Sequence, residues 1–476
     1  MANGNGKNGV EPTVLVVFGA TGDLAQRKIY PSLFDLYQKG LLPKKFLVIA
    51  FGRREFYDES YRTFVRESIQ KRKGEIEKSA IDPFLSTVRY IRGEFENMDS
   101  YKGLSDVLVE TDVRFNVCSN KLFYLAVPPT LYELILTKLS KSGLSIPCAN
   151  GEGWTRVLIE KPFGRDIETA HKLDRLLGKL FKEVQIFRID HYLAKETLQN
   201  ILAFRFSNAL FEPLWNRKHI ERIEIRAFEK EKVLNRGSLY DGLGALRDVG
   251  QNHLLSMLAL IAMEYPKDFS AQEMQKQRAN VIKNLIPLSS SEIKKVRRAH
   301  YRGFTEVEGV DISSKTETFF SLTARLKGSR FKGVPIELSA GKALEEDRAE
   351  ITVYFKDVVY AAHDIPSKRN VLTFRIQPDE GISILFWVKK PGITENAVHP
   401  QTLSFKYADA KETLHLPEAY EQVLFDCIRG DQTLFASTDE VEAAWKFVTP
   451  ILEKWGENKL DTYEPGASFE QIVKGN

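Results

Sequence analysis

The segment TVLVVFGATGDLAQRKIY near the start of the chain constrains the fold more than any other part of the sequence. The apolar, β-branched run from Val14 to Phe18 is typical of a buried parallel strand. Gly19 and Gly22 follow directly, and a helix is expected from Leu24 towards Tyr37. This order exposes backbone N–H groups to a pyrophosphate, whose close approach a Cβ would block. Because the motif reads G-A-T-G-D-L-A and not G-x-G-x-x-G, an ordinary turn between strand and helix stays an equal alternative on this motif alone.

The end of the next expected strand, Phe46 to Phe51, carries two arginines in FLVIAFGRREF. In a dinucleotide-binding fold this strand end meets the adenosine ribose, where an acidic residue binds the 2′-hydroxyl of NAD and an arginine accommodates the 2′-phosphate of NADP. We therefore predict that Arg53 binds the NADP 2′-phosphate and that Arg54 is solvated. A solvated surface position for both is the alternative.

The rest of the first half alternates between expected strands and helices. STVRYIRGEF, NKLFYLAVPP and TRVLIEKPFG are predicted strands, and TLYELILTKLSKSG is a predicted amphipathic helix. Ligands of such sheets bind at the carboxyl ends of the strands, where the segment from Tyr124 to Pro129 and Lys161 fall. We predict an α/β, Rossmann-like dinucleotide-binding domain over residues 1–188, with Lys161 directed into its cleft or, alternatively, merely solvated.

The second half has a different pattern. It contains the β-rich segments RIEIRAFEKE, TETFFSLTARLK, VPIELSAGKAL, AEITVYFKDV, NVLTFRIQPDEGISILFWVKK and TLSFKYAD. They predict a larger α+β domain over residues 189–476 with a broad, mainly antiparallel sheet, and with helices around Tyr240 to Met263 and Ala419 to Leu452. So many hydrophobic strands need cover on the far face of the sheet, so a dimer that packs sheet against sheet is a hypothesis.

Composition and charge narrow the class of protein. The 476 residues carry a net charge of +4 without a basic block, which gives little reason to expect nucleic-acid binding and is compatible with an anionic small substrate. Cys118, Cys148 and Cys427 are far apart, so neither a disulfide framework nor a zinc site is expected, and a reducing compartment is the simpler interpretation. The opening MANGNGKNGV lacks the apolar core of a signal peptide, and the longest apolar run, Leu254 to Met263, is too short to span a bilayer. A cytoplasmic protein without membrane association is expected.

The segment RIDHYLAKE places Asp190, His191, Tyr192 and Lys195 within nine residues. On a helix, His191 and Lys195 would share one face beside Tyr192, and near a helix N-terminus these groups would form a phosphate clamp. Asp190 would point about 100° away, towards a different partner. The alternative is an N-capping Asp190 in front of a solvated helix face.

A second polar cluster interrupts the expected helix ALRDVGQNHLLSML at Asp248, Gln251, Asn252 and His253. A histidine inside an apolar helix is more often a hydrogen-bonded core residue than a catalyst. In SAGKALEED, Lys342 follows a glycine at a strand end. None of these three segments is sufficient by itself to predict an activity.

Together these segments resemble the glucose-6-phosphate dehydrogenase family. The resemblance runs from about Val14 to Thr449 and rests, in matching order and spacing, on GATGDLAQRK, FYLAVPP, EKPFGRD, RIDHYLAKE, RDVGQNHLL, GKAL, RIQPDE, KKPG, GDQTLF and DEVEAAW. RIDHYLAKE together with EKPFGRD is its most specific part. The resemblance implies oxidation of D-glucose 6-phosphate at C1 to 6-phospho-D-glucono-1,5-lactone, the first step of the oxidative pentose phosphate pathway. It implies NADP as cofactor, with NAD as a weaker alternative, no metal, and a homodimer or dimer of dimers.

The resemblance also implies a role for individual residues. His253 is implied as the general base that removes the proton of the C1 hydroxyl as hydride leaves C1, and Asp190 as the carboxylate that orients it and raises its basicity. His191, Tyr192 and Lys195 are implied to bind the substrate phosphate. The sugar hydroxyls are implied to bind Glu229, Asp248 and Lys342, and Lys161 is implied to contact both sugar and cofactor. The residues implied to bind NADP are Gly19, Ala20, Thr21, Gly22, Asp23, Leu24, Arg53 and Tyr124.

One position departs from the family pattern. The family usually has a second basic residue five positions after the lysine of GKAL, and here that position is Asp347, followed by Arg348. An aspartate facing a partly desolvated phosphate would cost roughly 1 kcal/mol or more. Either Arg348 binds the phosphate instead, or the pocket is weaker, or the preferred sugar differs. A dehydrogenase of another hexose phosphate is therefore the first alternative, and a non-catalytic nucleotide-binding regulatory paralogue a distant second.

Overall fold

The computed structural model describes residues 11–148, 152–234, 236–357, 369–392, 398–409, 416–457 and 459–474. The chain divides into two compact units. Unit 1 comprises Met1–Gly164, Glu168–Ala194 and Pro417–Ala436, and unit 2 comprises Arg165–Ile167, Lys195–Leu416 and Ser437–Asn476. The polar opening of the chain, where we expected no signal peptide, lies outside the described residues.

Unit 1 is built on a seven-stranded sheet in the order β15-β6-β5-β4-β1-β2-β3. Its strands are β1 (Thr13–Phe18), β2 (Phe46–Gly52), β3 (Val88–Arg92), β4 (Asn120–Leu125), β5 (Thr155–Ile159), β6 (Ile186–Ile189) and β15 (Phe435–Ala436). The first six pair in parallel and only β15 is antiparallel, to β6. An order of 3-2-1-4-5-6 is that of the doubly wound dinucleotide-binding fold, so the predicted Rossmann-like architecture is confirmed.

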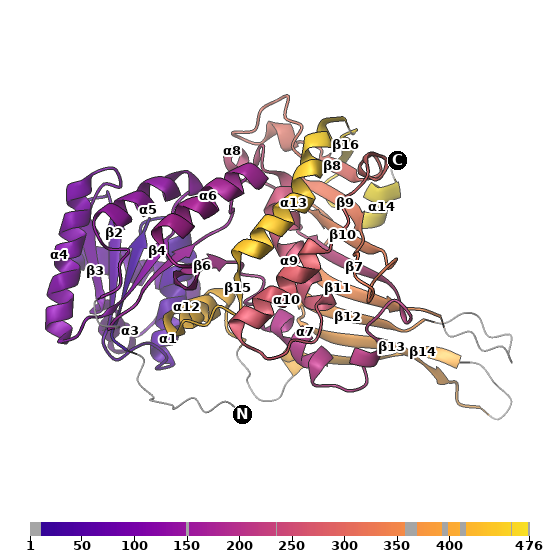
Figure 1. Cartoon of the computed structure of the whole chain (residues 1–476), viewed down its shortest axis with the longest axis horizontal. Helices are drawn as coiled ribbons and strands as arrows, with labels where there is room; N and C mark the ends of the chain where they lie inside the picture. The colour runs from indigo at the N-terminus through magenta and orange to yellow at the C-terminus, as the bar shows by residue number, and fades with distance from the viewer. Residues whose placement is uncertain are drawn as a thin grey trace. The chain divides into compact units, whose positions relative to one another are not determined.

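The helices of unit 1 flank this sheet (Figure 1). They are η1 (Ala25–Ile29), α1 (Tyr30–Gln38), α2 (Asp58–Lys73), α3 (Lys78–Leu85), α4 (Met98–Phe115), α5 (Tyr132–Lys141), α6 (Ile167–Leu180) and α12 (Ala419–Arg429). α1 contacts α2, α3 and α12, whereas α4 contacts α5. Every residue of β1 and β2 is buried, as expected for central strands of a sheet covered on both faces.

Unit 2 contains a nine-stranded sheet in the order β14-β13-β12-β11-β7-β10-β9-β8-β16. Its strands are β7 (Ile220–Phe228), β8 (Arg297–Tyr301), β9 (Phe319–Ala324), β10 (Ile336–Gly341), β11 (Arg348–Phe355), β12 (Val371–Gln377), β13 (Gly381–Lys389), β14 (Val398–Lys406) and β16 (Asp461–Tyr463). Only the β7–β10 and β8–β16 pairs are parallel. The predicted broad, mainly antiparallel sheet is confirmed.

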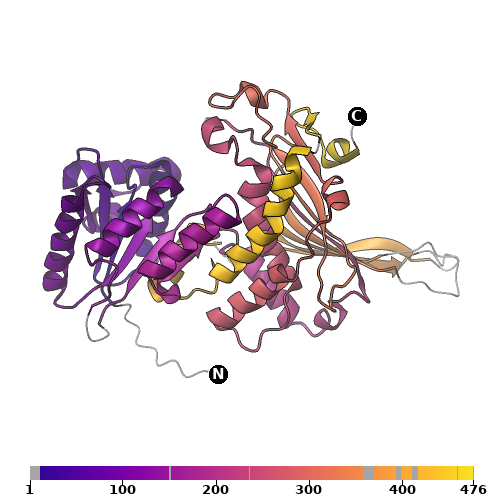
Figure 2. The same ribbon diagram turned by 45° about the horizontal axis from the view of Figure 1, so that its top comes forward.

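Helices of unit 2 lie over one face of its sheet (Figures 1 and 2). The helical segments of this unit are α7 (Glu196–Phe206), α8 (Gly237–Tyr240), η6 (Leu246–Leu254), α9 (Leu255–Ala262), α10 (Ala271–Lys283), α11 (Ser290–Ile293), α13 (Thr438–Lys454) and α14 (Phe469–Lys474). η6 packs on β7 and β10, and α7 packs on β12. Short 3₁₀ turns in the two units are η2 (Pro129–Leu131), η4 (Glu183–Gln185), η5 (Glu212–Leu214), η7 (Phe304–Glu306), η8 (Tyr407–Asp409) and η9 (Trp455–Glu457).

The expectation of no disulfide is wrong. Cys118 and Cys148 of unit 1 are joined, with their Cα atoms 6.5 Å apart, while Cys427 is a buried free cysteine. The start of β4 and the segment after α5 converge in space, which sequence spacing alone does not reveal. Across the part of the chain that the structure describes, no helix combines the length and apolar character needed to cross a membrane.

Candidate active site

The glycine turn follows β1, which lies between β2 and β4. Gly19 has a φ of +78°, and a Cβ placed on it would come within 2.3 Å of the Ala126 carbonyl oxygen and 2.8 Å of Val127 Cγ1. A Cβ on Gly22 would lie 3.0 Å from the carbonyl oxygen of Gly19. Position 19 therefore requires glycine, as expected for the turn that meets the pyrophosphate in a dinucleotide-binding fold. The other residues predicted for this part of the cofactor site, Ala20, Thr21, Asp23 and Leu24, lie in the same turn and the first helical residues after it.

Two buried tyrosines hold this turn in place. The hydroxyls of Tyr30 and Tyr61 each donate a hydrogen bond of 2.9 Å to the carbonyl oxygen of Ala20. The helix that follows begins with the π-helical segment η1, a geometry that is rare and often found at functional sites. The turn is thus a braced backbone cradle that fits the pyrophosphate of a dinucleotide.

Arg53 lies directly after β2, and its side chain is exposed. The backbone around it is fixed from the neighbouring strand, because the Tyr90 hydroxyl donates to the carbonyl oxygens of Gly52 (2.9 Å) and Arg54 (2.6 Å). Arg53 therefore lies on a hydrogen-bonded loop at the carboxyl end of β2. In a dinucleotide-binding fold, this strand end is where the 2′-phosphate of NADP binds.

Tyr124 lies in the interior of unit 1. It is fully buried, and its hydroxyl donates a 2.6 Å hydrogen bond to the Glu160 carboxylate. The Tyr132 hydroxyl donates to the backbone oxygen of Glu160 (2.8 Å), and Tyr420 of α12 hydrogen-bonds the same carboxylate. Burial raises the pKa of Glu160 to about 7, although the hydrogen bonds from Tyr124 and Tyr420 oppose the rise. These three tyrosines thus fix the residue directly before Lys161.

Lys161 follows β5, is half-buried, and is joined to Pro162 by a cis peptide bond. Its charge lowers the pKa of the adjacent Glu160, whereas the carboxylate of Asp190 acts in the opposite direction. Lys161, Glu160 and Asp190 therefore interact electrostatically within unit 1.

The expectation of a helix over RIDHYLAKE is wrong. β6 ends at Ile189, residues 191–194 form turns, and α7 starts only at Glu196 with Lys195 as its N-cap. Asp190 is 2% exposed, and its Oδ1 accepts a 3.0 Å hydrogen bond from the backbone N–H of Tyr192. A carboxylate that accepts from the backbone two residues later forms an Asx turn, which competes with helix formation. His191 and Lys195 therefore do not share a helix face.

Within unit 1 the His191 ring is flanked by two aromatic rings. The centroid of Tyr192 lies 5.3 Å away, and that of Tyr420 lies 6.3 Å away with an interplanar angle of only 18°. Tyr420 therefore contacts both the Glu160 carboxylate and the imidazole of His191. The orientation of this predicted phosphate ligand depends on a residue far away in the sequence.

In unit 2, Asp248 and His253 both lie on η6, which is a π-helix. Its i→i+5 hydrogen bonding gives more residues per turn than an α-helix and turns residues five apart towards a similar direction. His253 is 2% exposed, and the helix continues as α9, all of whose residues are buried. The predicted base thus lies buried at the end of a polar π-helical segment that continues into a fully buried apolar helix.

In unit 2, Lys342 lies close to the ring of Tyr240, and the charges of Asp248 and Glu229 act on the Tyr240 hydroxyl. The Lys342 ammonium forms an ion pair with the Glu229 carboxylate and lies 5.7 Å from the centroid of the Tyr240 ring. Burial raises the pKa of Tyr240 well above its usual value, and the charges of Asp248 and Glu229 raise it further. Among the described residues, the buried Tyr240 hydroxyl has no hydrogen-bond partner. An unpaired buried hydroxyl in a polar cluster fits a bound molecule that carries hydroxyl groups.

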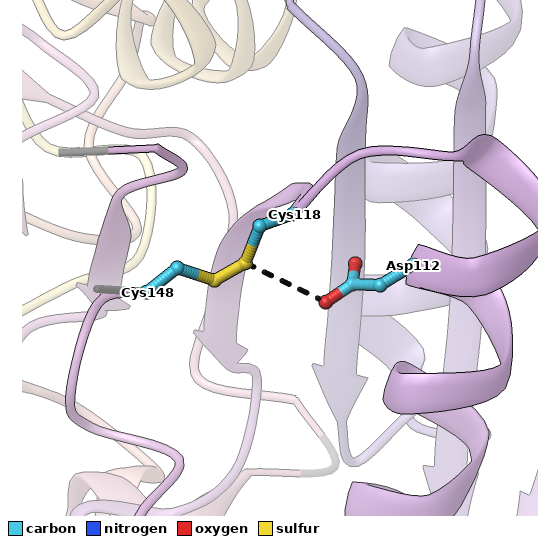
Figure 3. Close-up of side chains that lie close together, drawn as sticks. All are labelled: Asp112, Cys118 and Cys148. Carbon is cyan, nitrogen blue, oxygen red and sulfur yellow. Dashed lines mark hydrogen bonds between the residues drawn. A yellow bond between two sulfur atoms is a disulfide. The ribbon is translucent and has the colours of Figure 1, made fainter. Parts of the chain in front are cut away.

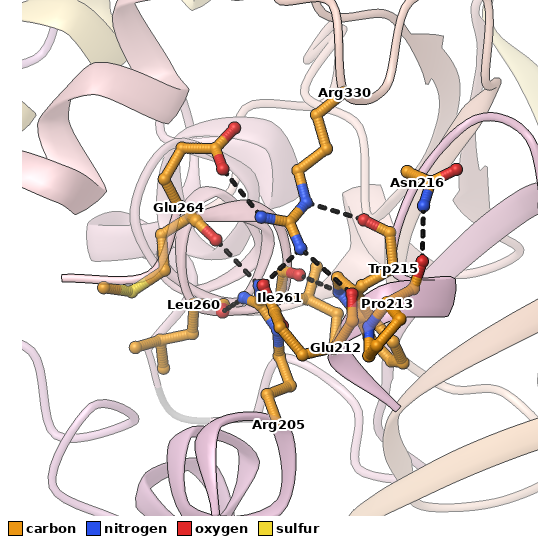
Figure 4. Close-up of polar contacts among 10 residues, drawn as sticks. Arg205, Glu212, Pro213, Trp215, Asn216, Leu260, Ile261, Glu264 and Arg330 are labelled. Atoms are coloured by element: carbon orange, nitrogen blue, oxygen red, sulfur yellow. Dashed lines mark hydrogen bonds and ion pairs between the residues drawn. The ribbon is translucent and has the colours of Figure 1, made fainter. Parts of the chain in front are cut away.

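The helices of unit 2 that carry Lys195 and His253 are joined at their other ends by a buried polar cluster (Figure 4). Arg205 on α7 is fully buried and donates to the backbone oxygens of Leu260 (3.0 Å) and Met263 (2.8 Å) at the end of α9. It also pairs with Glu212 at 3.2 Å. The last carbonyls of a helix have no partner within the helix, so Arg205 supplies one. Lys195 itself donates to Oε1 of Gln377.

Comparison with known proteins identifies the family. Residues 16–200 match the family profile "Glucose-6-phosphate dehydrogenase, NAD binding domain" and residues 202–471 match "Glucose-6-phosphate dehydrogenase, C-terminal domain". The chain belongs to the glucose-6-phosphate dehydrogenase family. Its nucleotide-binding unit therefore takes a nicotinamide dinucleotide, which agrees with the glycine cradle.

Relatives in this family match almost the whole chain. The glucose-6-phosphate 1-dehydrogenase of Treponema pallidum is 39% identical over 496 residues, covering 99% of this chain and 95% of the relative. That of Bacillus subtilis is 37% identical and covers 95% of this chain and 94% of the relative. A solved glucose-6-phosphate dehydrogenase in complex with glucose 6-phosphate has a TM-score of 0.90 at 33% identity and covers 98% of this chain and 96% of that one. The similarity thus extends over both units.

The departure from the glucose-6-phosphate dehydrogenase pattern at Asp347 has a local explanation. Its Oδ1 accepts a 2.8 Å hydrogen bond from the backbone N–H of Lys230. Arg348 pairs with Glu346 at 2.5 Å and with Glu350 at 3.5 Å. Asp347 therefore has a structural partner, and Arg348 would have to leave two carboxylates to bind a phosphate.

Three residues that the sequence did not single out lie beside predicted site residues: Glu160 and Tyr420 in unit 1, and Tyr240 in unit 2. Glu160 is the first residue of the motif EKPFGRD, but the sequence did not predict that its carboxylate is buried. Tyr420 lies in the C-terminal part of the chain and reaches unit 1 only through α12. No local sequence signal marks either tyrosine.

Proposed function

We propose that this chain oxidises D-glucose 6-phosphate at C1 to 6-phospho-D-glucono-1,5-lactone, with hydride transfer to NADP. The observation that carries the proposal is the similarity over nearly the full length of both units to a glucose-6-phosphate dehydrogenase solved with its substrate. Curated relatives of the family are named glucose-6-phosphate 1-dehydrogenase, which is the same activity. The reaction is the first step of the oxidative pentose phosphate pathway.

In the proposed reaction, His253 removes the proton of the C1 hydroxyl and Asp190 serves as its carboxylate partner. The near-complete burial of both side chains supports these roles, because an imidazole in a dry environment keeps its proton only when a carboxylate stabilises the charged form. When bound, the nicotinamide supplies the acceptor for the hydride. His253→Asn should lower kcat severely while glucose 6-phosphate still binds, and a near-normal kcat would refute the assignment.

The residues that we assign to the substrate come from both units. We assign the phosphate to His191, Tyr192 and Lys195, whose imidazole, hydroxyl and ammonium groups can all donate hydrogen bonds to phosphate oxygens. We assign the sugar hydroxyls to Glu229, Asp248 and Lys342, and contacts to both sugar and cofactor to Lys161. The clustering of Glu229, Asp248 and Lys342 around Tyr240 supports the sugar assignment.

We propose NADP as the preferred form of the nicotinamide dinucleotide and NAD as a weaker alternative. The exposed guanidinium of Arg53 at the carboxyl end of β2 supports this preference, since that strand end meets the adenosine ribose. Arg53→Ala should raise KM for NADP far more than KM for NAD. Equal effects on the two cofactors would refute the 2′-phosphate role. Arg54→Ala, one residue on and also exposed, is the matched control.

We further propose a cytoplasmic homodimer or dimer of dimers that associates through the sheet of unit 2. The names of two Arabidopsis thaliana relatives include "cytoplasmic". Leu403 and Phe405 of β14 are 63% and 45% exposed, which leaves apolar surface on that sheet to cover. Sedimentation of a monomer only, at micromolar concentration, would exclude the dimer.

The test of the substrate is a spectrophotometric assay of nicotinamide reduction by the purified protein. Glucose 6-phosphate, unphosphorylated glucose and glucosamine 6-phosphate are compared, each with NADP and with NAD. Fast turnover confined to glucose 6-phosphate supports the proposal and shows that the phosphate site works with Asp347 in place of a basic residue. A higher kcat/KM for another sugar phosphate would favour a different hexose-phosphate dehydrogenase, and no turnover with any of them would contradict an enzymatic role.

A further inference from the structure

The disulfide of unit 1 joins two half-buried cysteines at one end of the parallel sheet (Figure 3). Cys118 lies two residues before β4, and Cys148 lies in the segment between α5 and β5. Their Cα separation of 6.5 Å is within the range that a disulfide spans. The pair thus ties together the amino-terminal approaches of two neighbouring strands.

A lysine lies beside both sulfur atoms. The Lys121 Nζ is 3.9 Å from Cys118 Sγ and 3.8 Å from Cys148 Sγ. It also donates to Asp112 Oδ2 (2.9 Å) and to the backbone oxygen of Ser119 (3.0 Å), which hold it in position. The ammonium group lies close enough to stabilise a thiolate on Cys148, whereas Asp112 Oδ2, 3.7 Å from Cys118 Sγ, opposes a thiolate on Cys118. Thiolates are both the attacking and the leaving groups of disulfide exchange, so Cys148 is the favoured leaving group.

A metal site is the competing interpretation of the same cluster. Asp112, Cys118 and Cys148 offer ligand atoms that all lie within 4.8 Å of one another. However, the Lys121 ammonium lies within 4 Å of both sulfurs and already occupies the Asp112 carboxylate, so a divalent cation there would meet a fixed positive charge. The ammonium favours thiol chemistry over metal binding.

We propose that Cys118 and Cys148 form a reversible thiol–disulfide exchange site that accepts electrons from a dithiol reductant. A thiolate of the dithiol attacks one cysteine sulfur, the bond between the two cysteines breaks, and the other cysteine departs as a thiolate beside Lys121. The second thiol of the reductant then resolves the mixed disulfide. In total, two electrons and two protons pass from the dithiol to the cysteine pair, and the reductant becomes a disulfide.

We expect this exchange to change the stability of the protein and not the chemistry of the candidate active site. The cofactor turn and Lys161 lie at the carboxyl ends of β1 and β5, whereas the disulfide lies at the amino ends of β4 and β5. A six-residue strand such as β4 separates the two ends by roughly 20 Å. Closing the bridge constrains the unfolded chain over a sequence separation of 30 residues, so the oxidised form should unfold at a higher temperature.

Counting thiols tests the bridge. The protein is equilibrated with oxidised dithiothreitol, denatured, and alkylated with N-ethylmaleimide before mass spectrometry. Since the chain has three cysteines, the proposal expects one label, on Cys427, before reduction and three after it. Cys427→Ser should carry no label before reduction and two labels after it. Three labels on the oxidised wild type would overturn the proposal.

The rate of reduction tests the exchange site itself. With dithiothreitol in excess, Lys121→Gln should slow reduction roughly three- to tenfold, because the departing thiolate loses its neighbouring charge. Lys121→Arg, which keeps that charge, should stay close to the wild type and covers the case in which Lys121→Gln folds poorly. Lys102→Gln, an exposed lysine on the helix that carries Asp112, should have no effect. Equal rates in the wild type and Lys121→Gln would overturn the role of Lys121, and an unchanged unfolding temperature on reduction would overturn the effect on stability.

Discussion

At the scale of single residues, the unpaired hydroxyl of Tyr240 is the most direct indication of where a sugar binds. The side chain is 6% exposed, and the carboxylates of Asp248 and Glu229 are close enough to perturb its ionisation. Leaving a buried hydroxyl without a partner costs about 1–3 kcal/mol, so a bound sugar hydroxyl that pairs with it gains that amount.

We expect Tyr240→Phe to lower kcat/KM for glucose 6-phosphate roughly five- to 150-fold, mostly through KM. Thermal stability should stay the same or rise slightly, because the removed oxygen makes no hydrogen bond within the described residues. Steady-state kinetics together with a thermal melt checks both. Unchanged kcat/KM would show that the hydroxyl does not contact the sugar.

Glu160 makes the stability of unit 1 depend on pH. Its pKa is raised from 4.5 to about 7, chiefly by burial, so the folded chain binds this proton more tightly than the unfolded chain. The free energy of unfolding therefore falls as pH rises through the window from about 4.5 to 7, by about 3 kcal/mol in total. Burial raises the pKa of Asp426 to about 7 as well, and that group acts in the same direction.

Glu160→Gln should remove the Glu160 part of this dependence and leave the Asp426 part. Urea unfolding at pH 5 and pH 8 measures it: between the two pH values, the free energy of unfolding should fall by about 2.5 kcal/mol more in the wild type than in Glu160→Gln. Glu168→Gln, exposed on α6, should behave as the wild type. The same loss in the wild type and Glu160→Gln would mean that the carboxylate is ionised throughout.

Residue types at this site were predictable from the sequence, but their conformations were not. The motif RIDHYLAKE shows which groups come together, whereas its turn depends on one hydrogen bond from Tyr192 N–H to the Asp190 side chain. A helical pattern and an Asx turn are both compatible with the same nine letters, because Asp favours turns and caps alike. Tyr420 stacks on His191 through tertiary packing alone.

At the scale of secondary-structure elements, the placement of η6 and α9 depends on a buried charge cluster. Arg205 is fully buried, its pKa is lowered by burial to about 10, and it therefore stays charged at neutral pH. Arg330 extends the cluster, because it pairs with Glu212 and, at 2.6 Å, with Glu264. The indole N–H of Trp215 adds a 2.6 Å hydrogen bond to the backbone oxygen of Ile261 (Figure 4).

Arg205→Met should destabilise the protein by about 3–5 kcal/mol, because it leaves the last carbonyls of α9 without their buried donor and leaves Glu212 with Arg330 as its remaining cation. Differential scanning calorimetry or urea unfolding checks the change. Lys218→Met replaces an exposed cation in the same region and should change stability by less than about 0.5 kcal/mol. Comparable stability of the two variants would show that the cluster is dispensable.

Strands were the elements most visible in the sequence. β1 and β2 are short apolar runs buried on both faces, and the strands of unit 2 alternate, so their periodicity predicts them. The addition of α12 and β15 to unit 1 could not be predicted, because it depends on contacts between segments far apart in the chain. The same holds for Cys118 and Cys148, which no local pattern pairs.

At the scale of the whole molecule, the two units supply different parts of one proposed reaction. Unit 1 has the glycine cradle, Arg53 and the turn with Asp190 and His191. Unit 2 has His253 and the cluster around Tyr240. Neither unit alone contains all the proposed groups, so activity should require the intact chain. The overall architecture followed from the sequence because each half keeps one consistent pattern over its length.

In the proposed reaction, hydride leaves C1 of glucose 6-phosphate for the nicotinamide ring. The most direct measurement is to incubate the protein with NADP and glucose 6-phosphate deuterated at C1, and to locate the deuterium by NMR. We predict deuterium at C4 of the reduced nicotinamide and none at C1 of the product. Deuterium retained at C1 of the sugar, or released to water, would contradict it.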